Sequence, residues 1–232
     1  MNPFEQLLSQ ITTIEQRLGY SFNDSSLLAL AFVHRSIVNE SKEVHHHNER
    51  LEFLGDSVLG LLISDYLYTI LPATPEGELS YLRSRLVDAG SCYQYIQKLN
   101  IHSFLLLGRG ERLNDGRGRE SILADLFEAV IGAIFLDGGI ASVRQFLFFH
   151  FAKDFEAIIE TPQHNFKANL QDYCQKHYQQ TPVYQVISES GPDHNKQFKI
   201  SVSINQNEIG RGKGPSKKEA QQDAAKDAIS RF

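Results

Sequence analysis

Two apolar segments of the sequence carry carboxylates at helical spacing. The first segment carries Glu49, Glu52 and Asp56, which fall within roughly 60° of one another at about 100° per residue. The second carries Asp125 and Glu128, three residues apart and therefore on the same side. Because helices that are apolar nearly all round are usually buried, we predict two buried helices that each present acids on one side.

These acids have two interpretations, a solvated acidic stripe or a site for a cation. Unpaired carboxylates on mostly buried helices would cost several kcal/mol each or would take up protons, so the grouping favours a bound cation. Oxygen ligands without cysteine or paired histidine favour a hard ion such as Mg²⁺ or Mn²⁺ over zinc. The sequence therefore predicts a magnesium or manganese site.

Such a site requires the two acidic helices to lie close together. Small residues are found on the acidic side of each one, Gly60 on the first helix and Ala129 and Gly132 on the second, which is predicted to run over 121–135. Without large side chains between them, the two backbones can approach. We therefore expect a helix crossing that brings both sets of carboxylates to one point.

Two other segments contain residue types that bind ligands. His45, His46 and His47 are candidate metal ligands, but three adjacent residues in a polar loop cannot all face one ion. The Gly-rich stretch 108–118 is either a flexible loop or one that contacts phosphate. The arginines in and beside this stretch are Arg109, Arg112, Arg117 and Arg119. It lacks the spacing of a nucleotide-binding turn, so no nucleotide cofactor is predicted.

Composition indicates a folded protein outside the secretory pathway. The chain has 232 residues, 41% of them hydrophobic, which is enough for a real core. No apolar run approaches the ~18 residues needed to span a bilayer, and residues 1–10 lack a secretory signal pattern. We therefore predict a cytoplasmic protein with no membrane segment. Cys92 and Cys174 lie far apart and are predicted to be buried free thiols.

The formal net charge of −5 is divided unevenly along the chain. Residues 165–232 carry ten Lys or Arg and seven Asp or Glu, whereas the preceding residues carry 13 and 21. An acidic part joined to a basic part suggests that the basic part meets a polyanion. Helical periodicity dominates up to residue 159, and Pro162 interrupts it. The predicted division is an all-helical domain at 1–160, a linker at 161–164 and a second domain at 165–232.

The second domain is predicted to have the element order α-β-β-β-α. Its first helix begins near Phe166, with apolar residues at 3.6-residue spacing. Segments 183–188 and 198–205 are predicted strands, the latter because apolar and polar residues alternate. After a turn, a short third strand ends at Gly210. The last helix follows Ser216 and has an alanine stripe suited to lying close on a sheet.

The nine residues 49–57, Glu-Arg-Leu-Glu-Phe-Leu-Gly-Asp-Ser, resemble the defining motif of bacterial ribonuclease III. Residues 120–129 are similar to the family's second acidic motif, and 165–232 resemble its double-stranded-RNA-binding domain. The resemblance covers essentially the whole chain. It implies an all-α N-terminal endonuclease domain plus a small C-terminal α+β domain that binds double-stranded RNA.

The resemblance also assigns roles to the acids and to one aromatic residue. The implied nuclease residues are Glu52, Asp125 and Glu128 as metal ligands, Asp56 and Glu128 as catalytic carboxylates, and Glu49 and Glu76 as supporting acids. Phe53 matches an aromatic residue that the family inserts into the partner subunit of a homodimer, with plain core packing as the alternative. The implied cofactor is Mg²⁺, which Mn²⁺ can replace.

In the C-terminal domain, the resemblance assigns RNA contacts to three places. The implied contact residues are Gln171, His194, Ser216, Lys217 and Lys218. Many family members carry a further basic residue where this chain has Gln221, which weakens the expected phosphate contact there. The implied reaction is hydrolysis of double-stranded RNA to 5′-phosphate and 3′-hydroxyl ends with short 3′ overhangs, in processing of ribosomal RNA precursors and other structured transcripts.

Two rival functions fit parts of the sequence. A catalytically silent double-stranded-RNA-binding protein would keep the fold but would be expected to lose at least one carboxylate, and no loss is seen. A metal phosphohydrolase for small nucleotides would leave the basic C-terminal domain without a role. Magnesium-dependent cleavage of a long duplex discriminates among the three.

Overall fold

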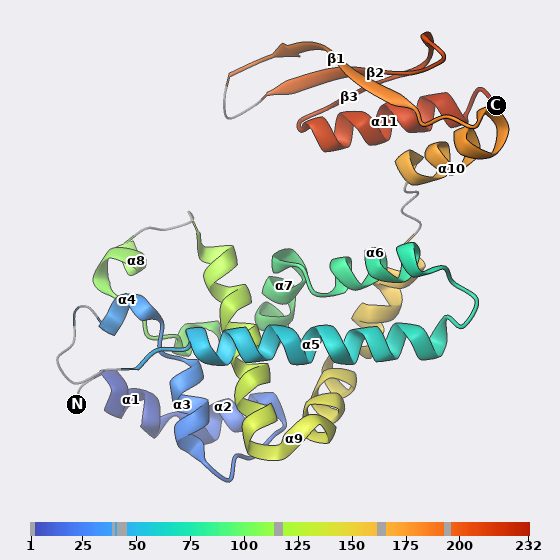
Figure 1. Cartoon of the computed structure of the whole chain (residues 1–232). Helices are drawn as coiled ribbons and strands as arrows, with labels where there is room; N and C mark the ends of the chain where they lie inside the picture. Colours follow the sequence, from blue (N-terminus) through green and yellow to red (C-terminus); the bar gives the residue numbers. More distant parts are fainter. Residues whose placement is uncertain (1–2, 39, 41–45, 114–117, 162–165, 193–195) are drawn as a thin grey trace. The chain divides into compact units, whose positions relative to one another are not determined.

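The computed structural model describes residues 3–38, 40, 46–113, 118–161, 166–192 and 196–232. The chain forms two compact units, Met1–Thr161 and Pro162–Phe232, each with its own hydrophobic core (Figure 1). The first unit is helical and the second combines two helices with a three-stranded sheet. The predicted fold class is confirmed.

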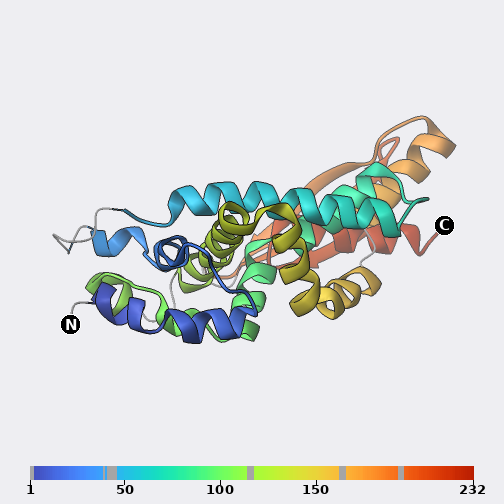
Figure 2. The ribbon, with the colours of Figure 1, turned by 90° about the horizontal axis from the view of Figure 1, so that it is seen from below.

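The helical unit is built around two long helices, α5 (Glu49–Ile70) and α9 (Arg119–Glu160). Its remaining elements are α1 (Pro3–Ser9), α2 (Ile11–Leu18), α3 (Ser25–Ala31), α4 (Arg35–Val38), α6 (Glu76–Leu86), α7 (Ala89–Leu99), the 3₁₀ turn η1 (His102–Phe104) and α8 (Arg109–Leu113). The first half of α9 lies between α5 and the N-terminal helices α1 and α2 (Figure 2). Because α9 is packed between other helices, the carboxylates that it carries are held in fixed positions.

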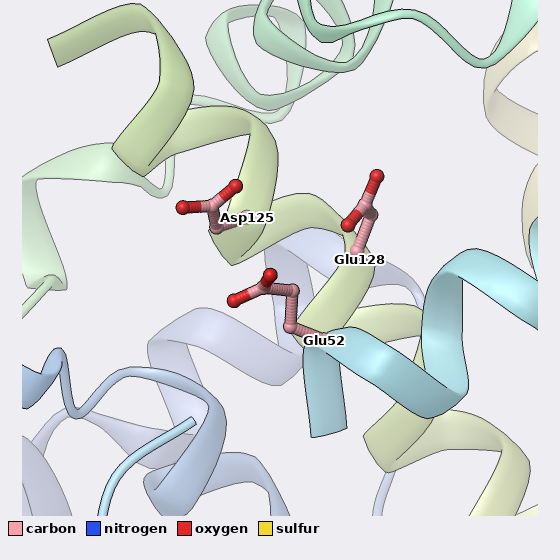
Figure 3. A group of neighbouring side chains, drawn as sticks. All are labelled: Glu52, Asp125 and Glu128. Carbon is pink, nitrogen blue, oxygen red and sulfur yellow. The ribbon is translucent and has the colours of Figure 1, made fainter. Parts of the chain in front are cut away.

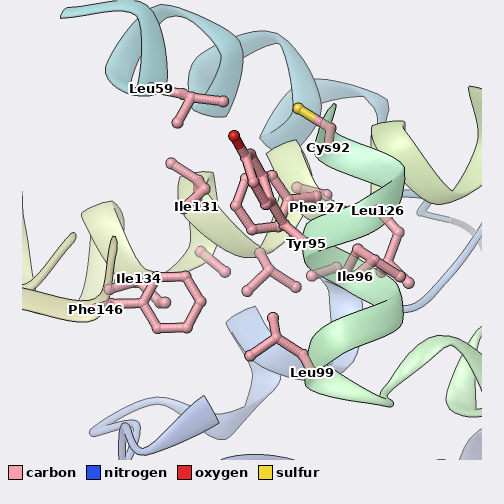
Figure 4. Close-up of a cluster of buried hydrophobic side chains, with 14 of the residues drawn as sticks. Leu59, Cys92, Tyr95, Ile96, Leu99, Leu126, Phe127, Ile131, Ile134 and Phe146 are labelled. Carbon is pink, nitrogen blue, oxygen red and sulfur yellow. The ribbon is translucent and has the colours of Figure 1, made fainter. Parts of the chain in front are cut away.

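An aromatic cluster holds α9 against α7. The Tyr95 ring lies 5.2 Å from that of Phe127 and 4.7 Å from that of Phe151, centroid to centroid. The Tyr95 hydroxyl donates to the Leu86 carbonyl oxygen at 3.1 Å, so its polar atom is satisfied within the core. Figure 4 shows the Tyr95 ring beside Phe127. Aromatic pairs at these separations stabilise the fold by more than their buried area alone would give. They fix the position of the helix that carries Asp125 and Glu128.

Both α5 and α9 are long and apolar enough, by length and composition, to cross a membrane. Their apolar residues have another use in this structure. Leu59 and Ile63 of α5, and Phe127 and Ile131 of α9, are fully buried within one hydrophobic cluster. Core packing accounts for these apolar residues of the two helices.

Helix α9 extends well beyond the predicted segment 121–135, because the apolar pattern resumes after a kink. Gly139 has φ 74° and ψ −177°, outside helical geometry, and the helix continues beyond it to Glu160. The Asp137 carboxylate, just before the kink, accepts hydrogen bonds from the Tyr20 hydroxyl at 2.7 Å and the Asp24 amide at 2.8 Å. The kink is thus tied to the start of α3.

The C-terminal unit has the predicted order α-β-β-β-α. Its elements are α10 (Phe166–Tyr178), β1 (Val183–Ser190), β2 (Gln197–Ile204), β3 (Asn207–Gly214) and α11 (Lys217–Ile229). The strands form one antiparallel sheet in the order β1-β2-β3. Asn205 and Gln206 have positive φ between β2 and β3, as a tight hairpin turn requires.

The predicted end of the third strand at Gly210 is wrong, since β3 continues to Gly214. Gly210, Gly212 and Gly214 alternate along β3 and are buried, and a Cβ on any of them would overlap α11. Alanines on the facing side of α11 make the same close approach possible. Glycine gives no apolar alternation, so the strand pattern was invisible beyond Gly210.

Cys92 and Cys174 are both free and buried, as predicted. Burial raises the pKa of the Cys92 thiol, and the neighbouring Glu128 carboxylate raises it further. The thiol therefore stays protonated and acts as a small core residue.

Candidate functional site

Helices α5 and α9 cross in direct backbone contact. A Cβ on Gly55 would overlap the carbonyl oxygen of Glu128, and a Cβ on Gly132 would overlap the carbonyl oxygen of Leu51. The predicted crossing is therefore present, with Gly132 in its expected place. The expectation for Gly60 is wrong, because open space surrounds it and Gly55 fills that role.

The crossing brings three carboxylates from the two helices together. Glu52 of α5 faces Asp125 and Glu128 of α9 (Figure 3). One oxygen from each lies within 4.8 Å of the other two, and all three side chains are half-buried. Among the described residues, no Lys or Arg forms an ion pair with any of the three.

Burial and mutual repulsion raise the pKa of all three groups. Burial, followed by the charges of Asp56, Asp125 and Glu52, raises the pKa of Glu128 to about 8. Burial and the Asp125 charge raise the pKa of Glu52, and burial and the Glu49 charge raise that of Asp125. Within the described part of the chain, no cationic side chain pairs with these carboxylates, which is the environment of a cation site. All-oxygen donors suit a hard divalent ion.

The other predicted acids, Asp56, Glu49 and Glu76, are not members of this three-carboxylate group. Asp56 is exposed on α5, one turn after Glu52, and its charge acts on both Glu52 and Glu128. Glu49 accepts a hydrogen bond from Arg35 at 3.0 Å. The exposed Glu76 begins α6 and accepts from the Ser80 hydroxyl at 2.8 Å; it is not part of the three-carboxylate group.

Among the described residues, the histidine segment does not form a second metal group. His47 Nδ1 lies 3.7 Å from Glu49, and His46 is exposed. His45 lies outside the described residues, as does Arg117. Arg109 and Arg112 belong to the short helix α8, and Arg119 begins α9.

One face of α5 points away from the core and is apolar. Phe53 is 77% exposed, Leu61 60% and Tyr68 76%. Gly60 lies among them, and a Cβ at that position would meet no atom within 4 Å, so the surface is open there. The alternative of plain core packing for Phe53 is therefore wrong within this chain.

The C-terminal unit presents polar groups where RNA contacts were predicted. Ser216 caps α11 by accepting from the Glu219 amide at 3.2 Å. Lys217 and Lys218 are exposed in the first turn of that helix, and Gln171 is exposed on α10. His194 lies outside the described residues. A capped helix start with two adjacent lysines suits phosphate binding.

Two family models match the two units. One, described as Ribonuclease-III-like, matches residues 24–155, and the other, described as Double-stranded RNA binding motif, matches residues 166–231. Together with the carboxylate centre, they define a nuclease joined to a double-stranded-RNA-binding domain. The chain belongs to the ribonuclease III family, which confirms the resemblance drawn from residues 49–57.

Relatives match over nearly the full length. The chain is 68% identical over 231 residues to Ribonuclease 3 of Protochlamydia amoebophila, covering 100% of this chain and 96% of that protein. It is 45% identical over 216 residues to Ribonuclease 3 of Streptococcus sanguinis, covering 90% and 91%. A solved structure of the ribonuclease III nuclease domain from Campylobacter jejuni, described for flexibility in a region involved in dimer formation, matches with TM-score 0.57 and 39% identity, covering 62% of this chain and 96% of that one.

Proposed function

We propose that this protein is an endoribonuclease that hydrolyses phosphodiester bonds in double-stranded RNA, using divalent metal ions held between α5 and α9. The family is one of metal-dependent endoribonucleases, which supports the reaction class. The observation that carries the proposal is the convergence of Glu52, Asp125 and Glu128 within 4.8 Å. Mg²⁺ is the proposed ion, and Mn²⁺ should replace it because both accept oxygen ligands in octahedral geometry.

The carboxylates hold cations and do not themselves contact bases. Glu52, Asp125 and Glu128 would be the ligands, and the exposed Asp56 would complete the set from the adjacent turn of α5. Bound divalent ions supply a deprotonated water, stabilise the leaving oxygen and offset phosphate charge. Glu128, whose pKa is about 8 in the metal-free protein, must release its proton to serve as a ligand. We assign Glu49 and Glu76 only supporting roles.

The C-terminal unit would hold the duplex through Gln171, His194, Ser216, Lys217 and Lys218. A-form RNA has a major groove too deep and narrow for side chains, so recognition should depend on minor-groove shape, 2′-hydroxyls and phosphates over about 16 base pairs. The exposed lysines at the start of α11 support phosphate contact. Base order should then matter little, and B-form DNA of equal sequence should bind far more weakly.

A homodimer would place one cleavage centre on each strand. The exposed Phe53, Leu61 and Tyr68 on α5 support a subunit interface on that face. Staggered cuts by two centres would leave short 3′ overhangs with 5′-phosphate and 3′-hydroxyl ends. We further propose action on ribosomal RNA precursors and other structured transcripts in the cytoplasm.

The test is cleavage of a long RNA duplex by the wild-type protein and by Glu128→Gln. The substitution removes a metal-binding charge but keeps the side-chain shape, so cleavage should be lost while RNA binding stays within about twofold. EDTA should stop the wild-type reaction, and Mn²⁺ should restore it. Near wild-type cleavage by the variant, or activity in chelator, would contradict the metal mechanism. Binding without cleavage by the wild-type protein would instead identify a silent RNA-binding protein.

A further inference from the structure

Lys167, near the start of α10, directs its ammonium group onto α11. Its Nζ donates to the side-chain oxygen of Gln221 at 2.7 Å and lies 5.0 Å from the centre of the Tyr184 ring. Its backbone amide donates to the side-chain oxygen of Gln222 at 3.1 Å. The lysine thus joins two elements that are 54 residues apart in the chain.

The position of Gln221 on α11 places this contact on the same helix face as Lys217 and Lys218. At about 100° per residue, Gln221 falls about 40° from Lys217 and about 60° from Lys218, between the two around the helix axis. It lies roughly 6 Å along the axis from Lys217. The Lys167 ammonium group, held at the tip of Gln221, therefore adds a third positive charge to the helix face that already carries two lysines.

The contacts that the structure describes for the Lys167 ammonium group are with uncharged groups. Among the residues that the structure describes, no carboxylate forms an ion pair with Lys167. Acids of α11 have other partners, since Asp223 accepts from the Lys213 amide at 2.9 Å and Asp227 from the Arg211 amide at 2.8 Å. An amide oxygen and an aromatic face orient an ammonium group while leaving its charge intact.

We propose that Lys167 is a third phosphate-contacting residue of the RNA-binding surface at the start of α11, oriented by Gln221 and Tyr184. The proposal rests on the proposed RNA-binding role of Lys217 and Lys218. It means that the basic group expected at position 221 is supplied from α10, through a lysine that lies elsewhere in the sequence. Gln221 is then a positioning residue, and its lack of charge does not weaken the surface.

A purely structural role for Lys167, as a clip between α10 and α11, makes different predictions. Loss of a clip lowers the thermal midpoint of the C-terminal unit but leaves the number of phosphate contacts unchanged. Loss of a phosphate contact flattens the dependence of log Kd on log salt by about one unit. The salt slope therefore separates the two roles, even where both affinity and stability fall.

The experiment measures binding of a 24-base-pair RNA duplex by the full chain in EDTA, over a salt series, together with the thermal midpoint. Lys167→Met should weaken binding roughly five- to tenfold at 0.15 M salt and lower the slope by about one. The matched control is Lys226→Met. Lys226 also lies over an aromatic ring, that of Phe166 at 5.7 Å, but is about 180° from Lys217 around α11.

A rescue variant returns the charge to α11. The double variant Lys167→Met with Gln221→Lys should recover the wild-type slope and most of the affinity, although the contact between the two residues is lost. An unchanged slope in Lys167→Met, or no recovery in the double variant, would overturn the proposal. Lys217→Ala with Lys218→Ala tests the underlying surface separately: if that variant binds like wild type, the proposed RNA-binding role fails instead.

Discussion

The substitution Glu128→Gln should stabilise the metal-free protein and should also abolish catalysis. Burial and three neighbouring carboxylates raise the pKa of Glu128 from 4.5 to about 8. Between these values the group is neutral in the native state and ionised in the unfolded state. The native state therefore binds more protons, and stability falls as pH rises from about 4.5 to about 8. Glutamine does not ionise, so the stability of Glu128→Gln should not show this fall with pH.

The magnitude follows from the same pKa values. A rise from 4.5 to about 8 corresponds, at about 1.4 kcal/mol per pKa unit, to at most about 5 kcal/mol. Glu128 is only half-buried, and solvent screening reduces that figure to about 2 kcal/mol. For a unit of this size, about 2 kcal/mol raises the thermal midpoint by roughly 4–8 °C.

The assay is differential scanning calorimetry in EDTA at pH 5 and pH 8, following the transition of the helical unit. The gain for Glu128→Gln should be largest at pH 8 and small at pH 5. Glu156→Gln removes an exposed carboxylate from the same helix and should show no comparable gain. A variant midpoint at or below wild type at pH 8, or an equal gain at both pH values, would refute the reasoning.

Three further outcomes are expected. Gly55→Ala should lower the thermal midpoint and cleavage together, because its Cβ overlaps the Glu128 backbone at a cost of about 1–3 kcal/mol; Gly77→Ala, with nothing within 4 Å, is the calorimetric control. Phe53→Asp should shift sedimentation towards the monomer without lowering helix content, since Phe53 is 77% exposed. A variant that still sediments as a dimer would contradict a subunit interface on this face of α5. A protein ending at Thr161 should cut RNA poorly at physiological salt and recover at low salt, as gel assays can measure.

The acids and their helices could be predicted from local pattern alone. The spacing of Glu49, Glu52 and Asp56, and of Asp125 and Glu128, places each group on one side of a helix whatever the fold. Apolar residues around them indicate burial, and buried unpaired carboxylates indicate a cation. The turn and strand signals of 183–205 were equally local, and the structure has strands there.

Other features depend on residues that are distant in sequence, and a single chain carries no signal of which pairs meet. The acidic side of α5 did not reveal whether Gly55 or Gly60 would face α9; the crossing angle of packed helices decides that, and only Gly55 lies under the Glu128 backbone. Whether Phe53 is core or surface was open for the same reason. The predicted boundaries at 160 and 165, and the roles of the site residues, stay predictions.

The residue types able to bind a cation or a phosphate can be identified from the sequence, since periodicity and charge are properties of neighbouring residues. Which of these residues act together depends on the packing of the folded domain. Glu52 joins Asp125 and Glu128 because two glycines let their helices touch, and Lys167 reaches Gln221 because α10 packs on α11. These contacts arise from the burial of apolar faces, which is a property of the whole domain and is set by no local pattern.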